Sequence, residues 1–192
     1  MIKPKKPSPT ESPLLFEIDP VPLEETLTAW GGVPLAVQAF RSLRIPARVQ
    51  QHVQVKQRDR GYDEATMVES FVVLNTLGGE CVDDFQHLRE DGGLQEMLGH
   101  EIPSPEAARQ FLKQFHSEEK IEEAREGRGP EQIAFIPEEG DALAGLGEVN
   151  RELVLELAKR CPEQRIVTVD LDATIIESRK REALRTYEGG LG

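Results

Sequence analysis

The sequence predicts an α+β protein, mostly helical as far as Arg160 and then extended in a strand near its end. Apolar residues recur at three- and four-residue spacing in several separate segments, which is typical of amphipathic helices. Residues 165–176 are instead β-branched and apolar, and alternate near their end, which is typical of a strand. An apolar fraction of 38% and a charged fraction of 30% suit a chain that folds in water.

In the first part of the chain, the sequence predicts an arm followed by short helices. Residues 1–22 hold six prolines and show little periodicity, so we expect an extended or disordered arm. Residues 23–40 predict two short helices around Gly31-Gly32, with Pro34 in the first turn of the second. The polar and basic residues 46–60 fit either a helix or a loop.

Two later segments begin with clear helix caps. Asp63 is a good N-cap for a helix over 63–77, which Gly78-Gly79 then ends. This helix is apolar on nearly every side, so we expect it at the centre of a small bundle. Ser104, followed by a proline and an acid, begins an amphipathic helix over 104–116.

The composition then changes twice. Residues 118–147 are acidic and rich in glycine, and residues 148–160 again follow a helical pattern. We therefore divide the chain into an arm (1–22), a helical domain (23–116), an acidic linker (117–147) and the start of a further domain (148–192).

Charge is distributed unevenly along the chain. The net charge of −12 disfavours a nucleic-acid binder, because phosphates are bound by Lys and Arg. Residues 41–60, however, carry six basic side chains against one acid. The segments 63–77, 82–90 and 104–116 also fit either a helix-turn-helix-like group or a plain packed bundle. The candidate DNA-binding residues are Arg41, Arg44, Arg48, Lys56, Arg58, Arg60 and Arg109.

Nothing in the sequence predicts secretion or a membrane span. The basic start of the chain is not followed by an apolar stretch, and no apolar run approaches the ~18 residues that cross a bilayer. Cys81 and Cys161 stand far apart and have no neighbouring cysteine, so we expect free, reduced thiols. These features favour the cytoplasm.

The sharpest chemical feature is the motif Asp-Leu-Asp-Ala-Thr at residues 170–174. Side chains alternate along a strand, so Asp170, Asp172 and Thr174 would share one face. Two carboxylates about 7 Å apart, given the ~3.3 Å rise per residue, favour a positive charge between them. Mg²⁺ prefers such oxygen ligands. The motif therefore predicts a magnesium site, with a plain surface cap of the strand as the alternative.

Two families share a hydrophobic strand that leads into this motif. It resembles the first strand of the RNase H-like catalytic domain of DDE transposases, where an Asp joins a later Asp and Glu to hold two Mg²⁺ ions. It is also similar to the first motif of haloacid dehalogenase-like phosphatases, which would make Asp170 a nucleophile and Asp172 an acid/base. That motif normally stands near the start of a phosphatase chain, which favours the transposases.

Other segments extend the resemblance to insertion-sequence transposases over roughly 25–116 and 150–192. They are the stretches 74–85, 88–91 and 98–99, the helix 103–112 with its Arg109, and the run from Glu177 to the Tyr-Glu-Gly-Gly at 187–190. By this resemblance Asp172 is the first catalytic carboxylate, with Asp170 as the fallback. The resemblance implies a fold that consists of a mostly helical domain followed by the first strands of an incomplete RNase H-like α/β domain.

The resemblance also implies the chemistry and the partners. Full-length members bind terminal inverted repeats and catalyse Mg²⁺-dependent DNA cleavage and strand transfer. The second Asp and the Glu would lie beyond Gly192, so we expect no cleavage by this chain alone. A non-catalytic DNA-binding fragment or regulator is the alternative, with a second copy or a full-length transposase as protein partner.

Overall fold

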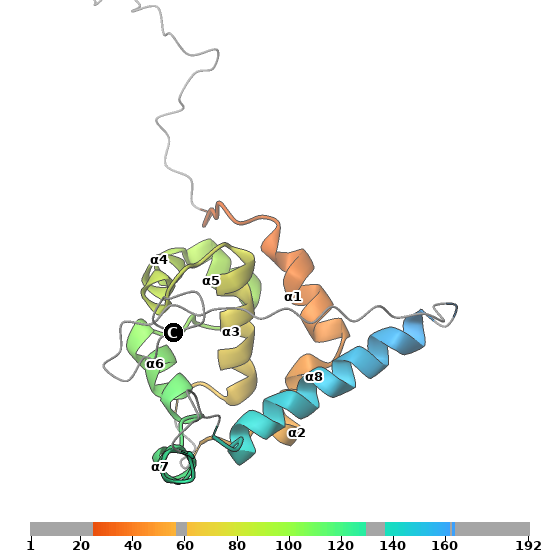
Figure 1. The fold of residues 1–192 in the computed structure, drawn as a ribbon. Coiled ribbons are helices and arrows are strands. Elements are labelled where there is room, and N and C mark those ends of the chain that lie inside the picture. Colours follow the sequence, from red (N-terminus) through yellow and green to blue (C-terminus); the bar gives the residue numbers. More distant parts are fainter. Residues whose placement is uncertain (1–24, 57–60, 130–136, 162, 164–192) are drawn as a thin grey trace, which may run out of the picture.

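The computed structural model describes residues 25–56, 61–129, 137–161 and 163, and within these ranges the chain is all-helical (Figure 1). These ranges contain eight α-helices and one 3₁₀ turn. They are α1 (Val33–Ser42), α2 (Ile45–His52), α3 (Glu64–Thr76), η1 (Val82–Asp84), α4 (Phe85–Glu90), α5 (Gly92–Leu98), α6 (Pro105–Lys113), α7 (Glu118–Glu126) and α8 (Asp141–Arg160).

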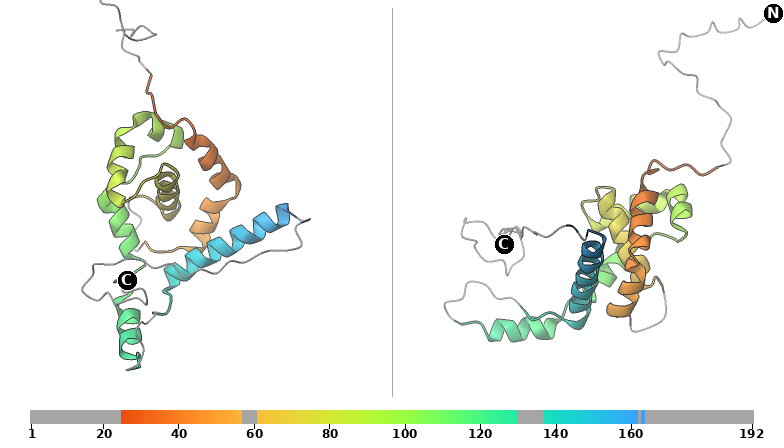
Figure 2. Two further views of the ribbon diagram at one scale, coloured as in Figure 1. Left: turned by 45° about the horizontal axis from the view of Figure 1, so that its top comes forward. Right: turned by 90° about the vertical axis from the view of Figure 1, so that its right-hand side faces the viewer.

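Helix α3 lies at the centre of the bundle, as its apolar sequence predicts. Viewed almost along its axis, it is surrounded by α1 and α2 on one side and by α4, α5 and α6 on the other (Figure 2, left). The Asp63 side chain accepts a hydrogen bond from the Thr66 N–H at 2.6 Å, which confirms the predicted N-cap. The helix ends before Gly78, whose φ of 78° confirms the predicted glycine stop.

The apolar core forms two adjoining clusters. In the larger one, Phe85, Leu94 and Ile102 are almost completely buried around α3. Phe71 of α3 contacts the ring of Phe85 edge-on, with 5.1 Å between centroids. The smaller cluster joins α2, α3 and α8, and its buried members are Val49, Val53, Ala65 and Val149.

Helix α8 lies across α2 and then extends past the body of the bundle (Figure 1). The contact is closest at the buried Gly145, where a Cβ atom would clash with the carbonyl oxygen of His52. Glycine therefore lets the two backbones approach at this point. Farther along, Val154, Leu155 and Leu157 are 64%, 48% and 45% exposed.

The predicted α+β class is wrong for the described residues, which contain helices and no strand. The prediction rested on a single segment, residues 165–176, and this segment lies outside the described residues. In α1, for example, the buried side chains Val33, Val37 and Phe40 follow one another at helical spacing. The RNase H-like part of the fold prediction depended on that same segment.

Two further expectations differ from the structure. The interval 117–147, predicted as a linker, contains α7 and the first turns of α8. Of the two helices expected in residues 23–40, the described residues contain one, α1, and residues 25–32 before it are irregular and pack against α5. A Cβ on Gly93 would lie 2.9 Å from the Leu27 carbonyl oxygen, and Thr28 Oγ1 donates a hydrogen bond to Asp91 Oδ2 at 2.7 Å.

Candidate functional site

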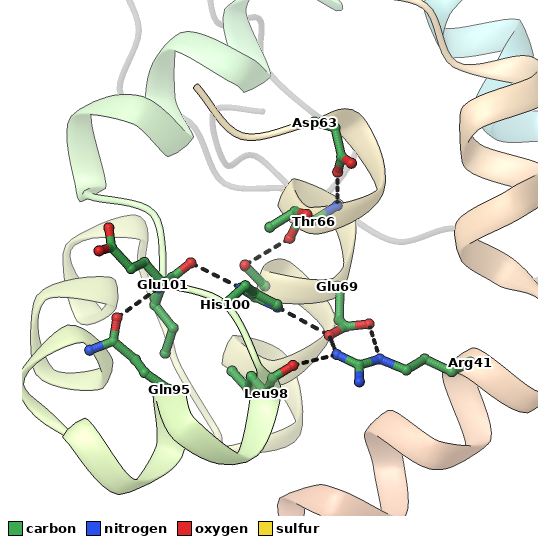
Figure 3. A network of polar contacts seen from close by, with 10 residues as sticks. Arg41, Asp63, Thr66, Glu69, Gln95, Leu98, His100 and Glu101 are labelled. Carbon is green, nitrogen blue, oxygen red and sulfur yellow. Dashed lines mark hydrogen bonds and ion pairs between the residues drawn. The ribbon is translucent and has the colours of Figure 1, made fainter. Parts of the chain in front are cut away.

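The most developed polar cluster surrounds Glu69 in the middle of α3 (Figure 3). Its carboxylate receives two hydrogen bonds from Arg41, at 2.9 Å from Nε and 2.5 Å from Nη2. The same Nη2 donates to the carbonyl oxygen of Leu98 at 2.7 Å, and His100 Nε2 lies 3.1 Å from Glu69 Oε1. The cluster thereby joins α1 and α3 to the α5–α6 connection.

Glu69 is held in its charged form. It is only 4% exposed, and this burial acts to raise its pKa. Hydrogen bonds from His100 and Arg41, together with their positive charges, outweigh burial and lower the pKa to about 2. The hydrogen bond to Glu69 in turn raises the pKa of His100 and of Arg41.

The geometry favours a doubly protonated His100 ring. Its Nδ1 lies 2.9 Å from the carbonyl oxygen of Glu101, and its Nε2 faces the Glu69 carboxylate. Both partners are acceptors only, so both ring nitrogens must donate to satisfy them.

This cluster acts as a structural tie rather than a reaction centre. Both Glu69 oxygens are engaged by cations, so no basic oxygen is left to take a proton from a substrate. The sequence analysis missed Glu69 and His100 as partners. The available signal was a lone acid in the middle of an otherwise apolar helix, which must find a partner when it is buried.

Three of the candidate DNA-binding arginines are engaged by carboxylates. Arg41 is bound to Glu69, as described above. Arg109 of α6 pairs with the exposed Asp83 of η1, and this pairing raises the pKa of Arg109. Arg48 lies between two glutamates of α8. Arg109, which the sequence analysis named as a candidate DNA-binding residue, therefore ties α6 to η1 in this structure.

The remaining candidates differ in position. Arg44 is exposed at the corner between α1 and α2, and no described carboxylate lies within ion-pair distance of it. Lys56 lines an open depression together with Tyr62 and with residues of α6. Arg58 and Arg60 lie outside the described residues, as do Asp170 and Asp172.

Side chains of α2 and α8 face each other in a charged seam. Arg48 Nε lies 3.6 Å from Glu152 Oε2, and Arg48 Nη2 lies 3.9 Å from Glu156 Oε2. His52 Nε2 is hydrogen-bonded to Glu152 Oε1 at 2.9 Å. A depression of about 220 Å³ adjoins this seam, and its lining residues are Arg44, Ala47, Arg48, Gln51 and Glu152.

Within the described ranges, no three His, Cys, Asp or Glu residues come together in a group that could hold a metal ion. Among the helices that the structure describes, none combines the length and apolar character that crossing a bilayer requires. Comparison with family models, curated proteins and solved structures gives no match to this chain.

Proposed function

We propose that the chain is the amino-terminal part of a DDE-type insertion-sequence transposase, and that its helical portion binds DNA. The observation that carries the proposal is the order of the sequence features. A helical stretch with the motif over 103–112 comes first, and the Asp-Leu-Asp-Ala-Thr motif and the Tyr-Glu-Gly-Gly at 187–190 follow. The compact helical body around α3 is compatible with an accessory domain that precedes catalytic carboxylates.

The chemistry assigned to this family requires a cluster of carboxylates. Asp172, with Asp170 as the fallback, would be the first of three residues that hold Mg²⁺. Bound Mg²⁺ would neutralise developing charge on a DNA phosphate and activate the attacking hydroxyl. The resemblance places only one of the three carboxylates within this sequence. The function proposed for this chain alone is therefore DNA binding without cleavage.

The charge pattern determines what kind of binding to expect. With a net charge of −12, the chain as a whole repels DNA, so its affinity must come from a local basic surface. Among the described candidates, Arg44 is exposed and has no described carboxylate within ion-pair distance, whereas Arg41, Arg48 and Arg109 already have carboxylate partners. Binding should accordingly be weak, and its dependence on salt should be shallow, because few phosphates are neutralised.

The test uses the full chain and two DNA duplexes of equal length. One carries the inverted repeat that flanks the coding sequence in its own genome, and the other has a scrambled sequence. We expect a mobility shift at low salt that is stronger for the repeat, and no cleavage after Mg²⁺ is added. An Asp172→Asn variant should bind both duplexes as the wild type does, because its role is in cleavage.

Two results would contradict the proposal in different ways. If neither duplex binds the chain at low salt, the proposed DNA-binding role is wrong. Cleavage of the repeat duplex in the presence of Mg²⁺, absent from Asp172→Asn, would show instead that this chain is an active nuclease.

A further inference from the structure

The charged seam between α2 and α8 consists of side chains at matching intervals. Arg48 and His52 are four residues apart and share one face of α2, and Arg44 directly precedes this helix. Glu152 and Glu156 of α8 are also four residues apart, and they lie opposite Arg48 and His52. Carboxylates therefore cover two of the three basic side chains, and Arg44 lies beside them on the adjoining depression.

The fit of Arg48 to these carboxylates is incomplete. Its two carboxylate contacts, at 3.6 and 3.9 Å, exceed hydrogen-bond length, whereas Arg41 bonds Glu69 at 2.5 and 2.9 Å. The Nη1 atom of Arg48 is buried and has no hydrogen-bond partner. Buried donors are normally satisfied, and a guanidinium suits a bidentate acceptor. The adjoining depression provides space for such an acceptor beside Arg44 and Arg48.

We infer that Arg44, Arg48 and His52 form a surface for DNA backbone phosphates, and that α8 shields Arg48 and His52 of this surface with Glu152 and Glu156. The carboxylates occupy the position where a phosphate would meet the same guanidinium. This inference rests on the proposed DNA-binding function and names the surface that performs it. It also makes α8 an inhibitory cover, because phosphate and carboxylate compete for one set of donors.

The packing of α8 allows such competition. Only Gly145 and Val149 of this helix are buried, and both lie in its first half. Its second half carries the two glutamates and exposes Val154 and Leu157. Apolar burial therefore holds the first half of α8, and its second half can shift while the core around α3 remains intact.

The first test removes the two charges of the cover. The full chain carrying Glu152→Gln and Glu156→Gln is titrated onto a fluorescent, mixed-sequence DNA duplex at several salt concentrations. Affinity should rise about tenfold at low salt, and the dependence of log K on log salt should steepen by about one. The matched control, Glu119→Gln with Glu123→Gln on exposed positions of α7, changes net charge equally and should gain less than about threefold.

Two more variants locate the effect. Adding Arg48→Gln to the Glu152→Gln/Glu156→Gln chain should abolish most of the gain in affinity, because Arg48 is the side chain that both glutamates contact. Gly145→Val, which leaves the charge unchanged, should lift α8 away from the His52 carbonyl and also strengthen binding. Gly147→Val, at an exposed position with open space around it, is its control and should leave the affinity unchanged.

The possible outcomes separate the two proposals. Equal gains in the α2–α8 and α7 charge variants, with no effect of Gly145→Val, would overturn the shielding inference and leave DNA binding in place. No binding by any variant, in chains whose helical content equals that of the wild type, would overturn DNA binding itself.

Discussion

Replacing Glu69 by Gln should destabilise the bundle in a way that depends on pH. The substitution keeps the size of the side chain and removes the charge to which Arg41 and His100 are bound. Arg41 would then have no carboxylate partner at the junction of α1 and α3. Because Glu69 is buried, solvent can replace only part of the lost interaction.

The magnitude of the destabilisation by Glu69→Gln follows from the pKa of Glu69. The difference between the ordinary value of 4.5 and about 2 in the fold is equivalent to about 3 kcal/mol of stability at neutral pH. The Arg41 side chain is 47% exposed, so solvent screens part of this interaction. We therefore expect Glu69→Gln to lower the free energy of unfolding by about 2 kcal/mol at pH 7.

The sign of the pH dependence follows from the direction of each shift. The pKa of Glu69 is lowered in the fold, so its contribution is complete above 4.5 and is lost as the pH falls towards about 2. The pKa of His100 is raised from 6.5, so its contribution is complete below 6.5 and is lost as the pH rises through the raised value. The Glu69 cluster is thus strongest in the mildly acidic range between these limits.

Urea unfolding followed by circular dichroism, from pH 7 down to pH 2, measures this effect. Wild type and Glu69→Gln should differ most near pH 6 and converge towards pH 2. The control is Glu101→Gln, which removes an exposed charge close to the same cluster and should cost less than about 0.5 kcal/mol. Parallel curves for wild type and Glu69→Gln across this range would refute the assignment of the lowered pKa to Glu69.

Three further predictions concern packing and caps, and each is checked by the midpoint of thermal unfolding. Gly145→Ala should destabilise the chain by more than about 1 kcal/mol, because its Cβ would clash with the His52 carbonyl, whereas Gly147→Ala should stabilise it by about 0.5–1 kcal/mol. The same sign at both glycines would contradict the close crossing of α8 over α2. Asp63→Ala should cost about 1 kcal/mol through loss of the α3 cap, and an unchanged midpoint would count against that cap. Phe85→Ala should cost about 3–5 kcal/mol, because its ring is fully buried beside α3, and a loss below 1 kcal/mol would place that ring outside the core.

Local signals in the sequence were sufficient for several helices. Asp63 and Ser104 act on backbone N–H groups three residues ahead of them, so each cap can be read from its immediate neighbours. The apolar run of the Asp63 helix required burial on all sides, and α3 does lie at the centre. The same local reasoning failed for residues 141–147, where two glycines suggested a linker and α8 forms.

The sequence by itself determined where α3 and α6 begin and that α3 must be central, because caps and periodicity act within a few residues. Only the tertiary structure decided which charges are available. Arg41, Arg48 and Arg109 look alike in the sequence, yet each has carboxylate partners, and these lie 26 or more positions away along the chain. Gly145 likewise looks like a helix breaker until α2 is placed against it. Such pairings depend on how separate helices cross, and no spacing within one helix encodes that.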